Sequence, residues 1–243
     1  MSPHEIELYA CAAAVVTAGL RALVLVGPAD GGAGGRAVSG GVQPGEVLAA
    51  VRAASARRPR PWVALGLFAV MAVMAVVQYA APAVVGDLMR QPGALSDGQW
   101  WRAATALLVQ SSGAAQIACN LPALLVVGVV AESVLGGWRT LGVFLVSGVA
   151  AQTVSLGGWA PRGGGDSVAV CGLVGALAVV CLLRGGDFGR TFKDSPLVLL
   201  VPAAGLFLCA IRNNHGVGLV VGCLLGLVLS VRTRAGLPRP AAA

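Results

Sequence analysis

The stretch WVALGLFAVMAVMAVVQYAAPAVV occupies residues 62–85 and contains no charged side chain. A helix needs about 20 consecutive apolar residues to cross the hydrocarbon core of a bilayer, and this stretch is long enough. It directly follows the basic cluster RRPRP at residues 57–61. Because the cytoplasmic flanks of membrane helices carry an excess of Lys and Arg, the stretch predicts a membrane helix that runs outward from the cytoplasm.

The composition of the whole chain supports the same inference. Hydrophobic residues make up 57% of the 243 residues, charged residues make up 11%, and the mean hydropathy is +0.82. Soluble domains carry about 25% charged residues, so this composition predicts an all-α integral membrane protein. The net charge is +7, but the cationic side chains are nearly all Arg and lie between apolar runs. We interpret them as topology signals and do not expect nucleic-acid binding.

Five further apolar runs follow the first one and complete a predicted six-helix bundle. The expected helices span residues 113–132, 140–156, 167–183, 196–211 and 215–231. Residues 86–102 form a long loop that ends in Trp100-Trp101-Arg102, a composition typical of the membrane–water interface. We therefore expect this loop to lie on the outer surface of the bilayer.

The distribution of positive charge agrees with this topology. From Arg57 onward, the loops assigned to the cytoplasm hold ten Lys or Arg, and the loops assigned to the outside hold four. The positive-inside rule then predicts a multi-pass protein of the cell membrane with both ends of the bundle in the cytoplasm. Membrane lipid is accordingly one expected partner.

The chain divides into three parts. Residues 1–60 are predicted to form an N-terminal extension, residues 61–232 the six-helix membrane domain, and residues 233–243 a cytoplasmic tail. Within the extension, residues 8–26 are apolar but are interrupted by Arg21, so they form either an extra membrane helix or a helix of a small cytoplasmic segment, and we favour the second. A glycine-rich linker at residues 27–45 and a short helix at residues 46–56 are expected to follow.

Six cysteines lie inside apolar runs, without a CxxC pair or a nearby His. They are Cys11, Cys119, Cys171, Cys181, Cys209 and Cys223. We interpret them as small packing residues, and we expect neither a metal nor a cofactor.

Two polar residues at matching depths attract attention, because polar groups inside a membrane are costly and are therefore often functional. Ser167 opens the fourth predicted helix and His215 opens the sixth, both from the outer side. A serine next to an imidazole is the first requirement of catalysis by a base-activated nucleophile. No carboxylate is expected at that depth, so the pair predicts a Ser-His dyad.

Small residues recur on the same two helices. Ser167, Cys171 and Gly175 lie four residues apart, and a second run of glycines begins three residues after His215. The second run is Gly218, Gly222 and Gly226. Small residues at this spacing allow helix backbones to approach closely, so these stripes predict packing of the fourth helix on the sixth.

Hydrogen-bond donors for an oxyanion are expected on the second helix. Asn120 and Gln116 lie one turn apart on one face near the outer end. Their amide N–H groups, together with backbone N–H groups at Ser167, are candidate donors to a tetrahedral intermediate.

These motifs, in this order, resemble the rhomboid family of intramembrane serine proteases. They are GQWWR at residues 98–102, Gln116-x3-Asn120, Gly128-x3-Glu132, Gly165-Asp166-Ser167 with Gly172 and Gly175, and His215-x2-Gly218-Leu219-x2-Gly222. The resemblance covers residues 62–231.

The resemblance implies a six-helix fold and cleavage of the transmembrane helices of other proteins near their outer ends. By matching position, Ser167 would be the nucleophile, His215 the general base and Asn120 an oxyanion donor. Trp101 and Arg102 carry over as structural residues of the first external loop. No metal or cofactor is implied.

Three positions depart from the family pattern. Most rhomboids have histidine at the position of Gln116 and glycine at the position of Val168, and many have a further histidine at that of Gln110. Gln116 retains an N–H donor, whereas Val168 places a branched side chain beside the nucleophile.

Three functions therefore remain open: an active intramembrane protease, a catalytically inactive relative that binds transmembrane helices, and a small-solute transporter. A transporter is expected to show an inverted repeat and further buried ionisable groups, and neither is evident.

Structural interpretations of the single residues also remain open. Ser167 is a common type of helix N-cap, and His215 has Asn213 and Asn214 beside it as partners. Asn120 and Gln116 can act as hydrogen-bonding contacts between helices. Asp166 is interpreted as a loop or cap residue rather than as a third catalytic group.

Overall fold

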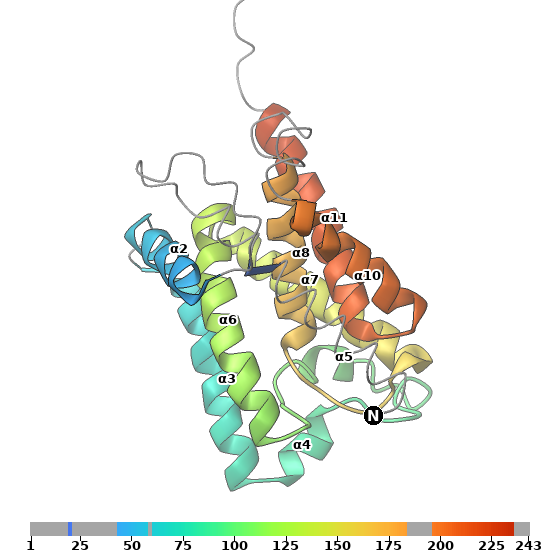
Figure 1. Ribbon diagram of the computed structural model, residues 1–243. Helices are drawn as coiled ribbons and strands as arrows, with labels where there is room; N and C mark the ends of the chain where they lie inside the picture. The colour runs from blue at the N-terminus through green and yellow to red at the C-terminus, as the bar shows by residue number, and fades with distance from the viewer. Residues whose placement is uncertain (1–18, 21–42, 58–59, 184–195, 236–243) are drawn as a thin grey trace, which may run out of the picture.

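The computed structural model describes residues 19–20, 43–57, 60–183 and 196–235 of the chain, and the predicted features of residues 1–18, 21–42 and 236–243 lie outside that part. The described residues form an almost entirely helical bundle (Figure 1). The principal helices are α2 (Pro44–Arg57), α3 (Trp62–Ala80), α6 (Ala114–Leu135), α7 (Gly137–Val154), α8 (Ser167–Leu183), α10 (Leu200–Ala210) and α11 (Asn214–Ala235). The short helices are α4 (Ala83–Leu88), α5 (Arg102–Thr105), a π-helical turn (Ser155–Trp159) and a 3-10 turn (Pro196–Leu199).

Three of these helical stretches are long and apolar enough to cross a membrane by themselves: 62–80, 114–135 and 137–159. The other three apolar helices of the bundle are shorter and span 167–183, 197–210 and 214–230. All six expected helices of the membrane domain are therefore present, and the all-α bundle predicted from the sequence is confirmed.

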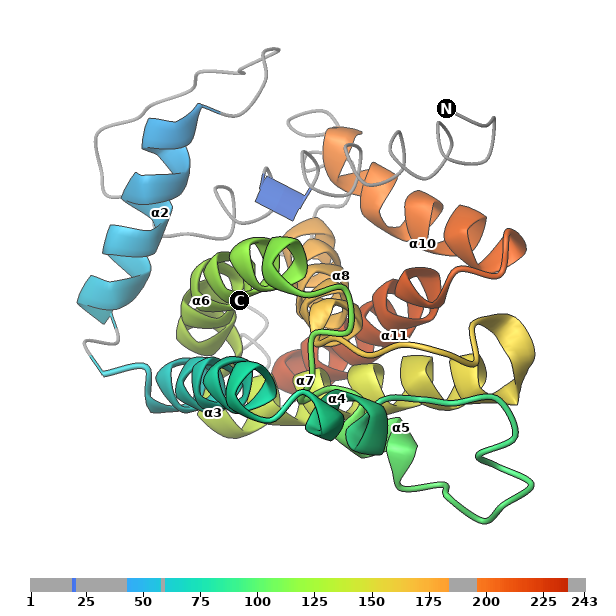
Figure 2. The same ribbon diagram turned by 90° about the horizontal axis from the view of Figure 1, so that it is seen from below.

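Helix α8 lies at the centre of the bundle. In both views α3 and α6 lie on one side of it, and α10 and α11 lie on the other (Figures 1 and 2). It packs against α6, α7, α10 and α11, and most of its side chains are buried. Because so much of α8 faces protein, polar groups at its N-terminal end are shielded from lipid and can be satisfied by neighbouring helices.

Glycines set the distance between α8 and α11. A Cβ atom added at Gly218 would lie 2.2 Å from the Val168 carbonyl oxygen, and one added at Gly222 would lie 2.0 Å from that of Gly172. On the α8 side, a Cβ added at Gly175 would lie 2.4 Å from the Leu219 carbonyl oxygen. We refer to this contact as the α8–α11 seam. Side chains are excluded there because backbone atoms already occupy the space.

The seam includes Gly175 of the expected stripe, but its other α8 residues lie on the neighbouring face. It uses Val168, Gly172 and Ala176, and a Cβ added at Gly226 would lie 2.7 Å from the Ala176 carbonyl oxygen. Cys171 instead lines an apolar cavity beside α6. The helix is rotated so that the backbone at Val168, Gly172 and Ala176 meets glycines of α11, and Ser167 then lies at the edge of the seam.

The first helix ends earlier than expected, at Ala80 rather than near residue 85. Pro82 explains the difference, because the residue before a proline avoids helical geometry. Ala81 accordingly has φ −136° and ψ 79°, and α4 begins only after Pro82.

The long loop after the first helix is held by Arg102. Its Nη1 donates to the carbonyl oxygens of Gly86 (3.0 Å) and Met89 (2.6 Å), and its Nε donates to the Gln99 side chain. Trp101 remains largely exposed and makes an edge-to-face contact with Trp100. These contacts give Arg102 a structural role within the loop.

A substitution in the seam tests its contribution to stability. We expect Gly222→Ala to lower the free energy of unfolding by about 1–3 kcal/mol, because the added Cβ meets a backbone carbonyl that cannot move aside. Gly66→Ala on α3 is the matched control, since a Cβ there meets nothing within 4 Å. Unfolding in mixed micelles, followed by circular dichroism, measures both changes. Equal stability of the two variants would contradict this account of the seam.

Candidate active site

Ser167 and His215 meet where α8 and α11 begin. Ser167 is the first residue of α8, and His215 is the second residue of α11. The Ser167 Oγ lies 2.9 Å from the His215 Nε2, which is a normal hydrogen-bond distance. The close approach of the two helices at Gly218 holds these short side chains within reach of each other.

Asn213 orients the imidazole ring. Its Oδ1 lies 2.9 Å from the His215 Nδ1 and also accepts the backbone N–H of His215 at 3.0 Å. Since this oxygen accepts only, Nδ1 must carry the ring hydrogen, and Nε2 is left with a lone pair. The Ser167 hydroxyl is therefore the donor, as proton transfer from serine to histidine requires.

The backbone that leads into Ser167 is held in place by amide and guanidinium groups. Arg90 donates to the carbonyl oxygens of Gly163 (3.1 Å) and Ala160 (2.6 Å), and the Gln152 Nε2 donates to that of Gly165 (2.9 Å). Burial lowers the pKa of the Arg90 guanidinium to about 10, so it stays charged at neutral pH. The segment before the serine is thus tightly constrained.

Gly165 has a steric reason to be glycine. Its φ is +158°, and a Cβ added there would lie 2.1 Å from the Gln116 Nε2. The Gln116 side chain passes over this position, donates to the Gly164 carbonyl oxygen at 3.0 Å and accepts the Ser112 backbone N–H at 2.8 Å. Any larger residue at position 165 would displace Gln116 from the site.

A carboxyl group lies beside the pair, in contrast to the expectation from the topology. The Asp166 side chain is fully buried, and its Oδ1 accepts from the Gln110 Nε2 (2.7 Å) and the Asn120 Nδ2 (3.0 Å). Asn120 also donates to the Gln110 Oε1 at 2.8 Å. We refer to Asp166, Gln110 and Asn120 as the amide–carboxyl cluster. The Asp166 backbone carbonyl accepts from two N–H groups in the first turn of α8, so the residue also lies at the helix cap.

Gln110 is anchored in turn by Gln78 on α3. The Gln78 Oε1 accepts the Gln110 backbone N–H at 2.9 Å, and its Nε2 donates to the Gln110 carbonyl oxygen at 3.3 Å. The cluster therefore connects α3, α6 and the start of α8 through groups that are all buried.

The two expected oxyanion donors lie next to Ser167, but both already have acceptors. Asn120 donates to Asp166 and Gln110, and Gln116 donates to Gly164. Either amide must therefore exchange a present acceptor for an oxyanion in order to take part in catalysis. Val168 is buried directly after the serine and lines the same polar cavity.

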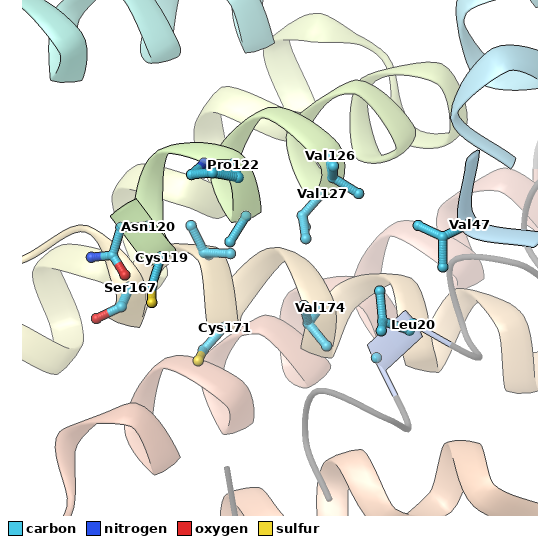
Figure 3. A pocket seen from close by; sticks show the side chains of 13 residues that line it. Leu20, Val47, Cys119, Asn120, Pro122, Val126, Val127, Ser167, Cys171 and Val174 are labelled. Atoms are coloured by element: carbon cyan, nitrogen blue, oxygen red, sulfur yellow. The ribbon is translucent and has the colours of Figure 1, made fainter. Parts of the chain in front are cut away.

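Ser167 lies between two cavities of opposite character. An apolar cavity of about 550 Å³ runs between α6 and α8, with Ser167, Asn120 and Cys119 at one end and Leu20 and Val47 at the other (Figure 3). A polar cavity of about 220 Å³ lies on the other side. Its lining includes Arg90, Gln116, Gln152, Arg162, Asn214 and His215. Ser167 can thus be approached by apolar groups from the first cavity and by polar groups from the second.

The sequence identified Ser167, His215, Asn120 and Gln116, and the structure brings all four to one end of α8. It assigned no role to Gln110 or Arg90, it interpreted Asp166 only as a loop or cap residue, and it named Asn213 only as one of two possible partners of His215. Asn213 had a weak signal, since it lies two residues before the histidine. Among the described residues, no group of three or more His, Cys, Asp or Glu could hold a metal ion.

Comparison with known proteins identifies the family. Residues 97–232 match the rhomboid domain, and this match covers more than half of the chain. The chain belongs to the rhomboid family. The rhomboid protease GluP of Bacillus subtilis (strain 168) is 30% identical over 148 residues, which is 61% of this chain and 28% of GluP. This rhomboid chain therefore spans less than a third of that relative. No solved structure is significantly similar to this chain.

The role of Asn213 can be tested by the reactivity of the serine. We expect Asn213→Ala to slow fluorophosphonate labelling of Ser167 about tenfold to a hundredfold, because the ring loses the acceptor that fixes its tautomer. Asn213→Asp keeps an acceptor at the same place and is expected to label at a rate near that of the wild type. Gel fluorescence over time measures the rates. Equal labelling of Asn213→Ala and the wild type would show that the ring is oriented without it.

Proposed function

We propose that this rhomboid protein is an intramembrane serine endopeptidase that cleaves the transmembrane segments of other membrane proteins through a Ser-His dyad. The observation that carries the proposal is the 2.9 Å contact between Ser167 and His215 inside a membrane bundle. Membership of the rhomboid family and the similarity to GluP, which is named a rhomboid protease, support it.

In the proposed reaction the Ser167 Oγ attacks the scissile carbonyl carbon while its proton passes to the His215 Nε2. The C–N bond of the tetrahedral intermediate then breaks, and His215 returns the proton to the leaving amine. A water molecule, deprotonated by His215, hydrolyses the acyl-serine and restores both side chains. No metal or cofactor takes part in these steps.

The negative charge on the carbonyl oxygen requires donors beside Ser167. Asn120 and Gln116 are the proposed side-chain donors, together with backbone N–H groups at the start of α8. The N-terminus of α8 also favours negative charge at this place. Loss of a single donor of this kind typically lowers kcat about 10²–10³-fold, so the acceptors that now hold Asn120 matter for activity.

The apolar cavity supports a transmembrane helix as the substrate. It lies between α6 and α8, is lined mostly by apolar side chains such as Val126 and Val174, and ends at Ser167. Apolar side chains of a helix fit such a lining, while the polar cavity offers room for water. We propose that lipid and substrate helices are the partners, and that the chain is a multi-pass cell-membrane protein with both ends of the bundle in the cytoplasm.

A catalytically inactive helix-binding relative is the second candidate. Both proposed amide donors hold other acceptors, and the branched Val168 follows the serine, which favours this alternative. The third candidate, a small-solute transporter, receives no specific support from the site.

Single substitutions in the dyad test the proposal. We expect Ser167→Ala and His215→Ala each to abolish both fluorophosphonate labelling and cleavage of a reporter transmembrane helix, because each removes one partner of the proton transfer. Ser133→Ala on α6 is the control, since its hydroxyl donates to the Val130 carbonyl oxygen of its own helix. Labelling and reporter cleavage in proteoliposomes are the measurements. Folded wild-type protein that neither labels nor cleaves would favour the inactive relative.

A further inference from the structure

The hydrogen bonds of Asp166 are distributed unequally between its two oxygens. Oδ1 accepts from both Gln110 and Asn120, whereas Oδ2 is buried and has no partner in the described part of the chain. An ionised carboxylate carries equal charge on both oxygens and requires donors for each. A neutral carboxylic acid has one carbonyl oxygen, which accepts strongly, and one hydroxyl oxygen, which accepts weakly. In the neutral acid Oδ2 is an uncharged hydroxyl, and burying it without a partner costs less than burying a charged oxygen without one, so the pattern favours the neutral acid.

The surroundings of Asp166 also favour the neutral form. Helix α6, helix α7 and the segment before α6 present the neutral amides of Asn120, Gln116, Gln152 and Gln110. The charged and titratable side chains near Asp166 and Ser167 line the two cavities at Ser167. Arg90, Arg162 and His215 line the polar cavity, and the thiols of Cys119 and Cys171 line the apolar one.

None of these groups forms an ion pair with Asp166. Arg90 directs Nε and Nη1 at the carbonyl oxygens of Gly163 and Ala160, and His215 bonds to Ser167 and Asn213. Burial raises the pKa of the Asp166 carboxyl above its usual 3.8, and the hydrogen bonds from Gln110, from the backbone N–H of Asp166 itself and from Asn120 offset part of that rise. The proton is therefore retained to higher pH than on an exposed aspartate.

We propose that Asp166 is a positioning residue that acts as a neutral acid, and that its ionisation withdraws Asn120 from the oxyanion and ends catalysis. The proposal rests on the proposed protease function and adds a control of the same site. The connection is the 3.0 Å bond from the Asn120 Nδ2 to the Asp166 Oδ1.

Ionisation of Asp166 opposes catalysis in two ways. A hydrogen bond to a charged acceptor is roughly twice as strong as one to a neutral acceptor, so the carboxylate holds the Asn120 amide and keeps it from the oxyanion. The carboxylate also places a negative charge beside the oxygen that becomes negative in the transition state. The neutral acid binds Asn120 weakly and adds no charge. Cleavage is thus expected to decline as the pH rises through the raised pKa of Asp166.

Asp166→Asn separates the neutral form from the charged one. The amide oxygen of Asn replaces Oδ1 as the acceptor for Gln110 and Asn120, and its NH₂ group replaces the hydroxyl. We expect this variant to cleave the reporter helix at the maximal rate of the wild type within about threefold and to lack the decline with rising pH. The wild type is expected to lose about 10²–10³-fold in kcat over that decline, the loss associated with one oxyanion donor. Asp97→Asn removes an exposed loop carboxylate and should keep the wild-type profile.

The opposite results would overturn the proposal. An inactive but folded Asp166→Asn would show that the charged carboxylate is needed, and an unchanged pH profile would show that Asp166 does not control the decline. Failure of Asp166→Asn to fold would also contradict it, because an amide replaces a neutral acid without loss of hydrogen bonds. Asp166→Ala, which is neutral and smaller, should cleave more slowly but again without the decline with rising pH.

Thermal unfolding in micelles separates this proposal from the proposed function. Because the folded-state pKa of Asp166 is raised, its stabilising contribution is complete at low pH and is lost as the pH rises through that value. The unfolding midpoint of the wild type is expected to fall over this range, relative to that of Asp166→Asn. This measurement needs no enzymatic activity. If the wild type is inactive but its unfolding midpoint falls, the protease function is contradicted and the neutral Asp166 is supported. If the wild type is active but its midpoint does not fall, the protease function is supported and the neutral Asp166 is contradicted.

Discussion

The close approach of α8 and α11 is the contact on which the rest of the site depends. Backbone carbonyl oxygens of one helix lie where the Cβ atoms of Gly218, Gly222 and Gly175 would be, so the two backbones touch directly. Within lipid, helices gain little from burying apolar surface against each other, and close van der Waals packing of small residues replaces that driving force. The same contact brings Ser167 and His215, both short side chains at helix starts, to hydrogen-bond distance.

Polar groups buried in a membrane protein are most stable when they satisfy one another, and the site does this largely with amides, with the Gln152 Oε1 and the Asp166 Oδ2 as exceptions among the described residues. Gln78, Gln110, Asn120, Gln116 and Gln152 link three helices to the segment before Ser167. Amides can donate and accept at once, so they form connected networks without adding charge. As a result, the N–H groups of Asn120 and Gln116 already donate to protein acceptors before a substrate binds. Their ability to stabilise an oxyanion then depends on how strongly those acceptors hold them.

Much of the fold could be predicted because lipid imposes a simple requirement. A membrane helix must be continuously apolar over about 20 residues, and the runs that begin at Trp62, Ala114 and Gly137 meet it. The boundary errors have local causes, such as the end of α3 before Pro82. The face of α8 that forms the seam was less predictable. Small residues lie on two neighbouring faces of that helix, Cys171 and Gly175 on one and Gly172 and Ala176 on the other, and only the packed position of α11 shows that Gly172, Gly175 and Ala176 meet it while Cys171 lines a cavity.

The sequence by itself determined the membrane helices, the pairing of Ser167 with His215 at one depth, and the family resemblance, because each depends on local composition and regular spacing. Only the tertiary structure decided the imidazole tautomer, through Asn213, and the surroundings of Asp166. Gln110 and Asp166 are 56 residues apart and meet only when the segment before α6 folds against the start of α8. The protonation state of a buried group depends on such non-local neighbours, and spacing along the chain does not record them.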